Sequence, residues 1–97
     1  MSDEFRELTA RDFTRALPRR TRERLISGAL RGGEDVQALR RFVGLSQNEF
    51  STALGISVHT LRNWEQDRRR PEGPALALLR IAARHPRVLR ESRATVR

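Results

Sequence analysis

The chain has 97 residues, which is enough for one small domain with a short appendage and argues against a large enclosed active site. A net charge of +8 favours a polyanionic partner, either DNA, RNA or an anionic membrane surface. The absence of cysteine excludes a disulfide framework, a thiolate zinc site and a cysteine nucleophile. No run approaches the roughly 20 apolar residues of a membrane span, and the charged N-terminus lacks a signal-like apolar segment, so we expect a soluble cytoplasmic protein.

The N-terminal third predicts two short amphipathic helices on either side of Pro18. One carries Phe5, Leu8, Phe13 and Leu17, and the other carries Leu25, Ile26 and Leu30. Helices of this length need tertiary packing to persist in water. Residues 1–35 hold 8 Arg against 7 Asp and Glu, whereas residues 36–97 hold 12 against 5, so the polyanion-binding part is expected in the second segment.

The Gly32-Gly33 pair followed by Glu34 and Asp35 indicates a joint and then a new helix N-terminus. We therefore predict an N-terminal helical extension over residues 1–34, a globular domain over 35–91 and a flexible tail over 92–97. A helix begins near Asp35, carries Val36, Leu39 and Val43 on one face and ends at Gly44.

Two capped helices follow in close succession. Ser46 and Glu49 form the capping-box pattern of one helix, which ends at Gly55, and Ser57 caps the next after a turn of three residues. Such a short turn forces the two helices to cross steeply. A further helix is expected after Pro71, Gly73 and Pro74 and is stopped by His85-Pro86, and a short closing turn around Val88 and Leu89 precedes the tail.

The stretch SQNEFSTALGISVHTLRNWEQ, residues 46–66, resembles the helix-turn-helix of the Cro and phage-repressor superfamily, often called the XRE family. The resemblance implies an all-α fold, a compact four- to five-helix lambda-repressor-like bundle carrying the N-terminal extension. Leu61 and Trp64 point inward, and Trp64 is assigned to the core without a DNA contact. The opposite face of the helix from about Val58 to Gln66 is predicted to enter the major groove of double-stranded operator DNA.

Helical spacing divides the predicted DNA contacts into two groups. The base-reading candidates are the outward side chains of the first two turns, where an Arg fork suits guanine, an Asn amide suits adenine and a Val methyl suits thymine: Val58, His59, Arg62 and Asn63. The candidates for contacts with the DNA backbone lie at helix N-termini, flank the helix from Val58 to Gln66 (the reading helix) or follow it as a basic run: Gln47, Ser57, Thr60, Gln66, Arg68, Arg69 and Arg70. The alternative for the basic run is a set of solvated charges without a DNA contact.

Catalysis finds no support in the sequence. His59 and His85 are each isolated from Cys and from carboxylate clusters, so we expect no metal site. No nucleophile or acid–base constellation converges, so we expect no enzyme and no cofactor. General RNA binding is disfavoured because no aromatic stacking platform accompanies the positive charge.

The segment from Ser57 to Leu89 is similar to the HigA and NadS type of antitoxin-like regulators, in the order Asn-Trp-Glu, Arg-rich residues, Pro, Gly-Pro and an Ala-Leu-rich helix. Asp67 departs from the Gly common at its position, which is expected to tighten or shift the chain after the reading helix. The resemblance implies a homodimer that represses its own operon and neutralises a RelE/HigB-like ribonuclease toxin. The toxin would bind the apolar residues of the N-terminal segment, namely Phe5, Leu8, Phe13, Leu17, Leu25, Ile26 and Leu30. Those residues could equally pack on the bundle or form a dimer contact. The alternative is a stand-alone XRE-family repressor with no toxin partner.

Overall fold

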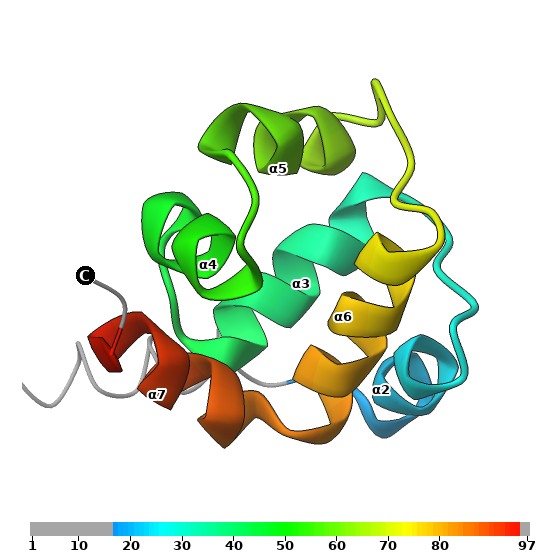
Figure 1. The fold of residues 1–97 in the computed structure, drawn as a ribbon. Coiled ribbons are helices and arrows are strands. Elements are labelled where there is room, and N and C mark those ends of the chain that lie inside the picture. Colours follow the sequence, from blue (N-terminus) through cyan, green and yellow to red (C-terminus); the bar gives the residue numbers. More distant parts are fainter. Residues whose placement is uncertain (1–16, 96–97) are drawn as a thin grey trace, which may run out of the picture.

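A computed structural model describes residues 17–95 of the chain as a bundle of helices with no strand among them (Figure 1). The predicted all-α helix-turn-helix bundle is therefore confirmed. In chain order the helices are α2 (Arg19–Ile26), α3 (Gly33–Val43), α4 (Gln47–Leu54), α5 (Val58–Glu65), α6 (Pro74–Arg84) and α7 (Pro86–Thr95).

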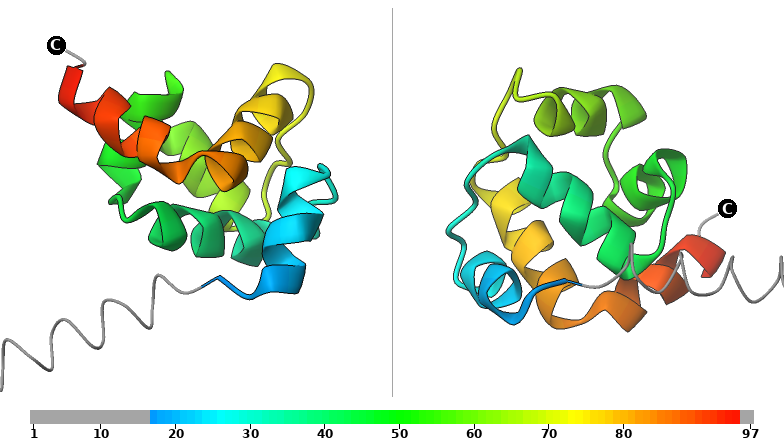
Figure 2. Two further views of the ribbon diagram at one scale, coloured as in Figure 1. Left: turned by 90° about the horizontal axis from the view of Figure 1, so that it is seen from below. Right: turned by 180° about the vertical axis from the view of Figure 1, so that it is seen from behind.

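Helix α3 runs through the middle of the bundle, with α4 and α5 on one side of it and α6 and α2 on the other (Figure 1). Its Val36, Leu39 and Val43 have no exposed surface, as expected from their helical spacing. The view from behind shows α7 closing the end of the bundle beside α4 and α6 (Figure 2). The core is mostly aliphatic, with two aromatic side chains, and takes residues from all six described helices and from the α3–α4 turn: Leu25, Val36, Leu39, Val43, Leu45, Phe50, Leu54, Leu61, Trp64, Leu79, Ala82, Ala83 and Leu89.

The two predicted serine caps are present. The Ser46 hydroxyl accepts a hydrogen bond from the Glu49 backbone N–H at 3.1 Å, and the Glu49 carboxylate accepts one from the Ser46 N–H at 3.0 Å. The Ser57 hydroxyl accepts from the Thr60 N–H at 3.0 Å. Each cap satisfies N–H groups that the first helical turn leaves without partners, which fixes where α4 and α5 begin.

Helix α2 is part of the bundle. Leu25 is 3% exposed and belongs to the core, and Leu17, Ile26 and Leu30 pack against that core. The predicted boundary between residues 34 and 35 falls inside the first turn of α3, and the described residues on both sides of it share one core. Phe5, Leu8 and Phe13 lie outside the described residues.

Arginine side chains from neighbouring helices bind the carbonyl groups at three helix C-termini. Arg22 of α2 donates to the Ala83 carbonyl at the end of α6 (2.9 Å), and Arg80 of α6 donates to the Ile26 carbonyl at the end of α2 (3.0 Å). Arg90 of α7 donates in the same way to the last carbonyl of α3, at Val43. These contacts satisfy orphan carbonyls at the negative ends of the helix dipoles and tie the helices together.

The C-terminal end differs from the prediction of a short turn followed by a tail from residue 92. Helix α7 begins at Pro86, a residue well suited to a first helical position, and continues to Thr95. Its length follows from tertiary packing, because Leu89 is 6% exposed in the core and Arg90 holds the end of α3. A ten-residue helix of modest propensity is stabilised by such packing.

Candidate DNA-binding surface

Helices α4 and α5 form the predicted helix-turn-helix. Gly55 ends α4 with φ +77°, a left-handed conformation that glycine adopts without strain. The Ile56 N–H then returns to the Ser51 carbonyl at 2.9 Å, and Ser57 begins α5. The turn therefore places α5 across α4 with its N-terminal turn at the edge of the bundle (Figure 1).

Helix α5 has an inward and an outward face, as its spacing predicted. Leu61 is fully buried and Trp64 is 6% exposed, which confirms the assignment of Trp64 to the core. Of the outward candidates, His59 and Arg62 are exposed, whereas Val58 and Asn63 are half-buried. The same helix that is fixed by its buried face thus presents an Arg fork, an amide, an imidazole and an aliphatic group at the surface.

The chain after α5 folds back on the helix. The Asn63 carbonyl accepts hydrogen bonds from the backbone N–H groups of Arg68 (2.9 Å) and Arg69 (3.3 Å). As a result, six residues from the helix and from the basic run line one open hollow: His59, Thr60, Asn63, Trp64, Arg69 and Arg70. The structure therefore brings predicted base-reading and backbone-contact residues together.

The predicted backbone-contact residues differ in their surroundings. Gln66, Arg68 and Arg69 are exposed. Arg70 is also exposed, but its guanidinium donates to the Leu30 carbonyl at 2.9 Å and so ties the basic run to the loop between α2 and α3. The hydroxyls of Ser57 and Thr60 lie 3.0 Å apart and hydrogen-bond to each other. Gln47 is half-buried and makes contacts of its own, described next.

A network of polar side chains links α5 to α3 and α4. Glu65 is buried, and its carboxylate pairs with the Arg40 guanidinium of α3 at 2.7 Å. The same carboxylate accepts from the Gln47 side-chain amide of α4 at 2.9 Å, and the Gln47 amide oxygen accepts from Arg62 Nε at 3.2 Å. Sequence reasoning missed this network. A signal was available, because Glu65 follows Leu61 by four residues and therefore lies on the inward face.

Asp67 fills the position at which glycine was expected. It adopts a left-handed φ of +62°, so the backbone takes the conformation that glycine would favour. Its carboxylate also accepts from the Gly33 N–H at 2.8 Å and so caps the N-terminus of α3, which begins 34 residues earlier in the chain. The chain after α5 is therefore anchored to α3, an effect that the sequence pattern did not reveal.

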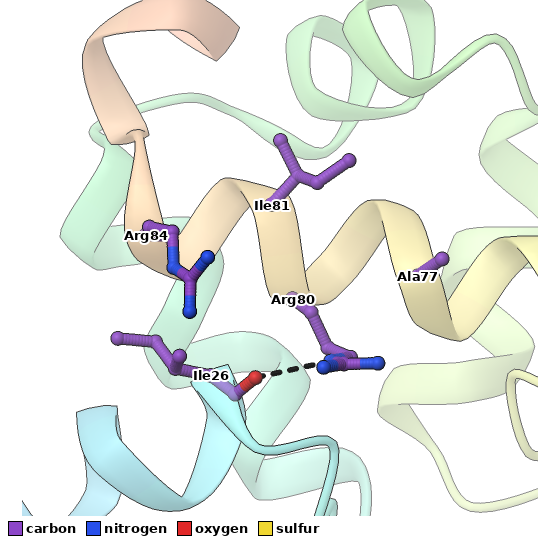
Figure 3. A pocket seen from close by; sticks show the side chains of 5 residues that line it. All are labelled: Ile26, Ala77, Arg80, Ile81 and Arg84. Atoms are coloured by element: carbon purple, nitrogen blue, oxygen red, sulfur yellow. Dashed lines mark hydrogen bonds between the residues drawn. The ribbon is translucent and has the colours of Figure 1, made fainter.

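A second hollow lies between α2 and α6 and is lined by Ile26, Ala77, Arg80, Ile81 and Arg84 (Figure 3). The Arg80 side chain crosses it to reach the Ile26 carbonyl, so this hollow is built around a structural contact. Among residues 17–95, no group of three His, Cys, Asp or Glu side chains is placed to hold a metal ion. The described helices include none that is long and apolar enough to cross a membrane.

Comparison with known proteins identifies the family. The sequence model of the antitoxin component of bacterial toxin-antitoxin systems, MqsA, matches residues 9–93, which is most of the chain. The chain belongs to the MqsA antitoxin family. The predicted resemblance to XRE-type antitoxins is therefore confirmed at the level of the family.

Curated relatives of this MqsA-family chain match slightly more than half of it. Antitoxin HigA-2 of Vibrio cholerae serotype O1 is 38% identical over 56 residues, which cover 58% of this chain and 54% of that protein. The HTH-type transcriptional regulator YiaG of Escherichia coli strain K12 is 33% identical over 52 residues, 54% of each chain. The chain thus spans about half the length of the curated relatives it matches. No solved structure matches it.

Proposed function

We propose that this chain is a homodimeric antitoxin that binds operator DNA through the outward face of α5 and represses its own operon. The observation that carries the proposal is the arrangement of α5, whose buried Leu61 and Trp64 fix the helix while Arg62 and His59 face solvent. Two such helices in a dimer would meet successive major grooves about 34 Å apart and favour a palindromic operator.

Charge and local geometry support a division of the candidate residues into those that contact bases and those that contact phosphates. Arg62 can donate to guanine O6 and N7 and Asn63 can pair with adenine, while Val58 and His59 complete the base-facing set. Arg68 and Arg69, exposed directly after α5, would contact phosphates, as would Gln66 and the N-terminal turns of α4 and α5 at Gln47, Ser57 and Thr60. Arg70 would add charge there while remaining bound to Leu30.

The test is binding of the full chain to the promoter of its own operon and to base-substituted copies of it. Arg62→Ala and Asn63→Ala are each expected to reduce discrimination at one position by roughly 5- to 150-fold, equivalent to about 1–3 kcal/mol. Arg69→Ala should instead weaken all sequences alike and reduce the slope of log K against log salt by about 1. Fluorescence anisotropy over a salt series measures both quantities.

The matched control is Arg20→Ala, which removes one exposed arginine from α2 instead of from the α5 region. It is expected to change neither the base preference nor, beyond a small general effect of charge, the affinity. Unchanged base preference in both Arg62→Ala and Asn63→Ala would show that α5 does not read the operator.

We further propose that the N-terminal segment neutralises a RelE/HigB-like toxin. The membership of an antitoxin family supports a toxin partner in general. Because Leu25 is buried and Leu17, Ile26 and Leu30 pack on the core, the apolar residues best suited to a partner are Phe5, Leu8 and Phe13.

Co-expression with the product of the neighbouring gene tests this second part. Phe5→Asp with Leu8→Asp in the full chain should abolish co-purification of the toxin and relief of its growth arrest, while operator binding is unchanged. Arg6→Ala in the same segment is the control and should leave capture intact. Capture that survives Phe5→Asp with Leu8→Asp would refute the N-terminal site, and the lack of any toxin partner would favour a stand-alone repressor.

A further inference from the structure

Arg62 is the outermost member of a hydrogen-bonded series that reaches the interior. From the surface inward, Arg62 Nε donates to Gln47 Oε1 (3.2 Å), and Gln47 Nε2 donates to Glu65 Oε1 (2.9 Å). The Glu65 carboxylate is in turn paired with Arg40 through two contacts, at 2.7 and 3.3 Å. The position of the exposed guanidinium is thus set by a carboxylate whose side chain is only 3% exposed.

The chemistry of the two neighbours determines which way the Gln47 amide faces. A carboxylate only accepts hydrogen bonds and a guanidinium only donates them. The Gln47 NH₂ group must therefore point to Glu65, and its carbonyl oxygen must point to Arg62. A reversed amide would place oxygen against oxygen and nitrogen against nitrogen, so the series has one stable polarity.

We propose that Gln47 is a specificity-determining positioning residue, which holds the Arg62 guanidinium so that its Nη1 and Nη2 edge faces the base. This inference rests on the proposed reading of operator DNA by α5. With Nε engaged by Gln47, the two terminal nitrogens are the donor pair left to match O6 and N7 of a guanine. The role is distinct from the phosphate contact predicted for Gln47 from its place at the start of α4.

Fixing the side chain before binding has a physical benefit. An exposed arginine has many rotamers, and ordering it at an interface opposes binding. A guanidinium already held in one orientation loses less freedom on contact with the correct base. It also cannot readily swing to a wrong base or to a phosphate, so removing the Gln47 contact is expected to reduce discrimination more than total affinity.

The experiment compares the full chain with Gln47→Met, which preserves the length of the side chain but neither donates nor accepts as an amide does. Gln37→Met is the matched control, because Gln37 also donates to Glu65, at its backbone carbonyl (3.4 Å), whereas the Arg62 side chain donates to Gln47. Arg62→Ala first maps the base pair that Arg62 reads. At that base pair Gln47→Met is expected to lower discrimination about tenfold, and Gln37→Met to leave it unchanged.

Three further measurements show whether a loss of discrimination in Gln47→Met comes from the lost contact with Arg62. Hydrogen exchange at Arg62 Nε–H, followed by NMR without DNA, should accelerate in Gln47→Met and stay as in the wild type in Gln37→Met. The double variant Gln47→Met with Arg62→Ala should discriminate no worse at the mapped base pair than Arg62→Ala alone. Thermal unfolding checks that Gln47→Met is folded at the temperature of the binding assay.

An equal loss of affinity by Gln47→Met on every probe, with discrimination intact, would overturn the inference and leave Gln47 with the phosphate contact alone. Unchanged exchange at Arg62 Nε–H would overturn it as well. Those outcomes leave operator reading by α5 in place. If Arg62→Ala changed no base preference, the reading by Arg62 and the positioning role of Gln47 would both be wrong.

Discussion

Replacing Gly33 with alanine is expected to lower the free energy of unfolding by about 3 kcal/mol or more. A Cβ at this position would lie 2.2 Å from the Glu65 carbonyl oxygen and 2.7 Å from that of Trp64. Both atoms belong to the backbone at the end of α5, so α3 and α5 would have to move apart. The movement would also disturb the Asp67 cap on the Gly33 N–H.

Thermal unfolding followed by circular dichroism measures the effect, which for a domain of this size corresponds to a shift of roughly 12–24 °C in Tm. Gly32→Ala is the control, because its Cβ would meet the Asp67 carboxylate oxygen at 3.1 Å, and a small shift of that side chain relieves the contact at the cost of a weaker cap on Gly33. It should cost clearly less than Gly33→Ala. Equal stability of the two variants would show that the close approach of α3 to α5 is not required.

Removing the Glu65 carboxylate has the second large expected effect. Glu65→Ala would leave the Arg40 guanidinium, whose side chain is 15% exposed, without its partner at 2.7 Å. Breaking a buried pair on one side costs about 3–5 kcal/mol because the remaining charge stays desolvated. Gln47 Nε2 would lose its acceptor at the same time.

Urea denaturation of Arg40→Met, of Glu65→Met and of the double variant that combines them forms the appropriate cycle. Arg40→Met with Glu65→Met should be much more stable than Glu65→Ala, since apolar side chains of similar volume can replace a buried ion pair at little cost. If the double variant were as unstable as the sum of the singles, the loss would come from packing and not from an unpaired charge.

The helices that define the candidate binding surface could be predicted because their signals are local. Ser46 and Ser57 cap α4 and α5 where expected, Gly55 turns the chain, and Leu61 and Trp64 fall on the buried face. Each of these depends on residues within one or two turns of each other. Periodicity and capping therefore sufficed for the architecture of the helix-turn-helix.

The contacts between distant segments could not be predicted in the same way. Asp67 caps a helix that begins 34 residues earlier, and Glu65 pairs with Arg40 across 25 residues. Helical spacing shows that a polar residue faces inward, but it does not show which partner faces it. The burial of Leu25 and the length of α7 could not be predicted for the same reason. Both depend on packing against residues more than ten positions away along the chain.

The arginines that bind helix C-termini count toward the net charge, but we expect salt to act on them differently than on arginines that contact phosphate. Arg22, Arg80 and Arg90 contribute to the +8, yet each has a donor bound to a carbonyl within the fold. Salt competes with phosphate contacts through counterion release but screens partly buried contacts much less. Concentrated salt is therefore expected to strip co-purifying nucleic acid from the protein, while the part-buried contacts of Arg22 and Arg90, and the bundle they hold, remain in place.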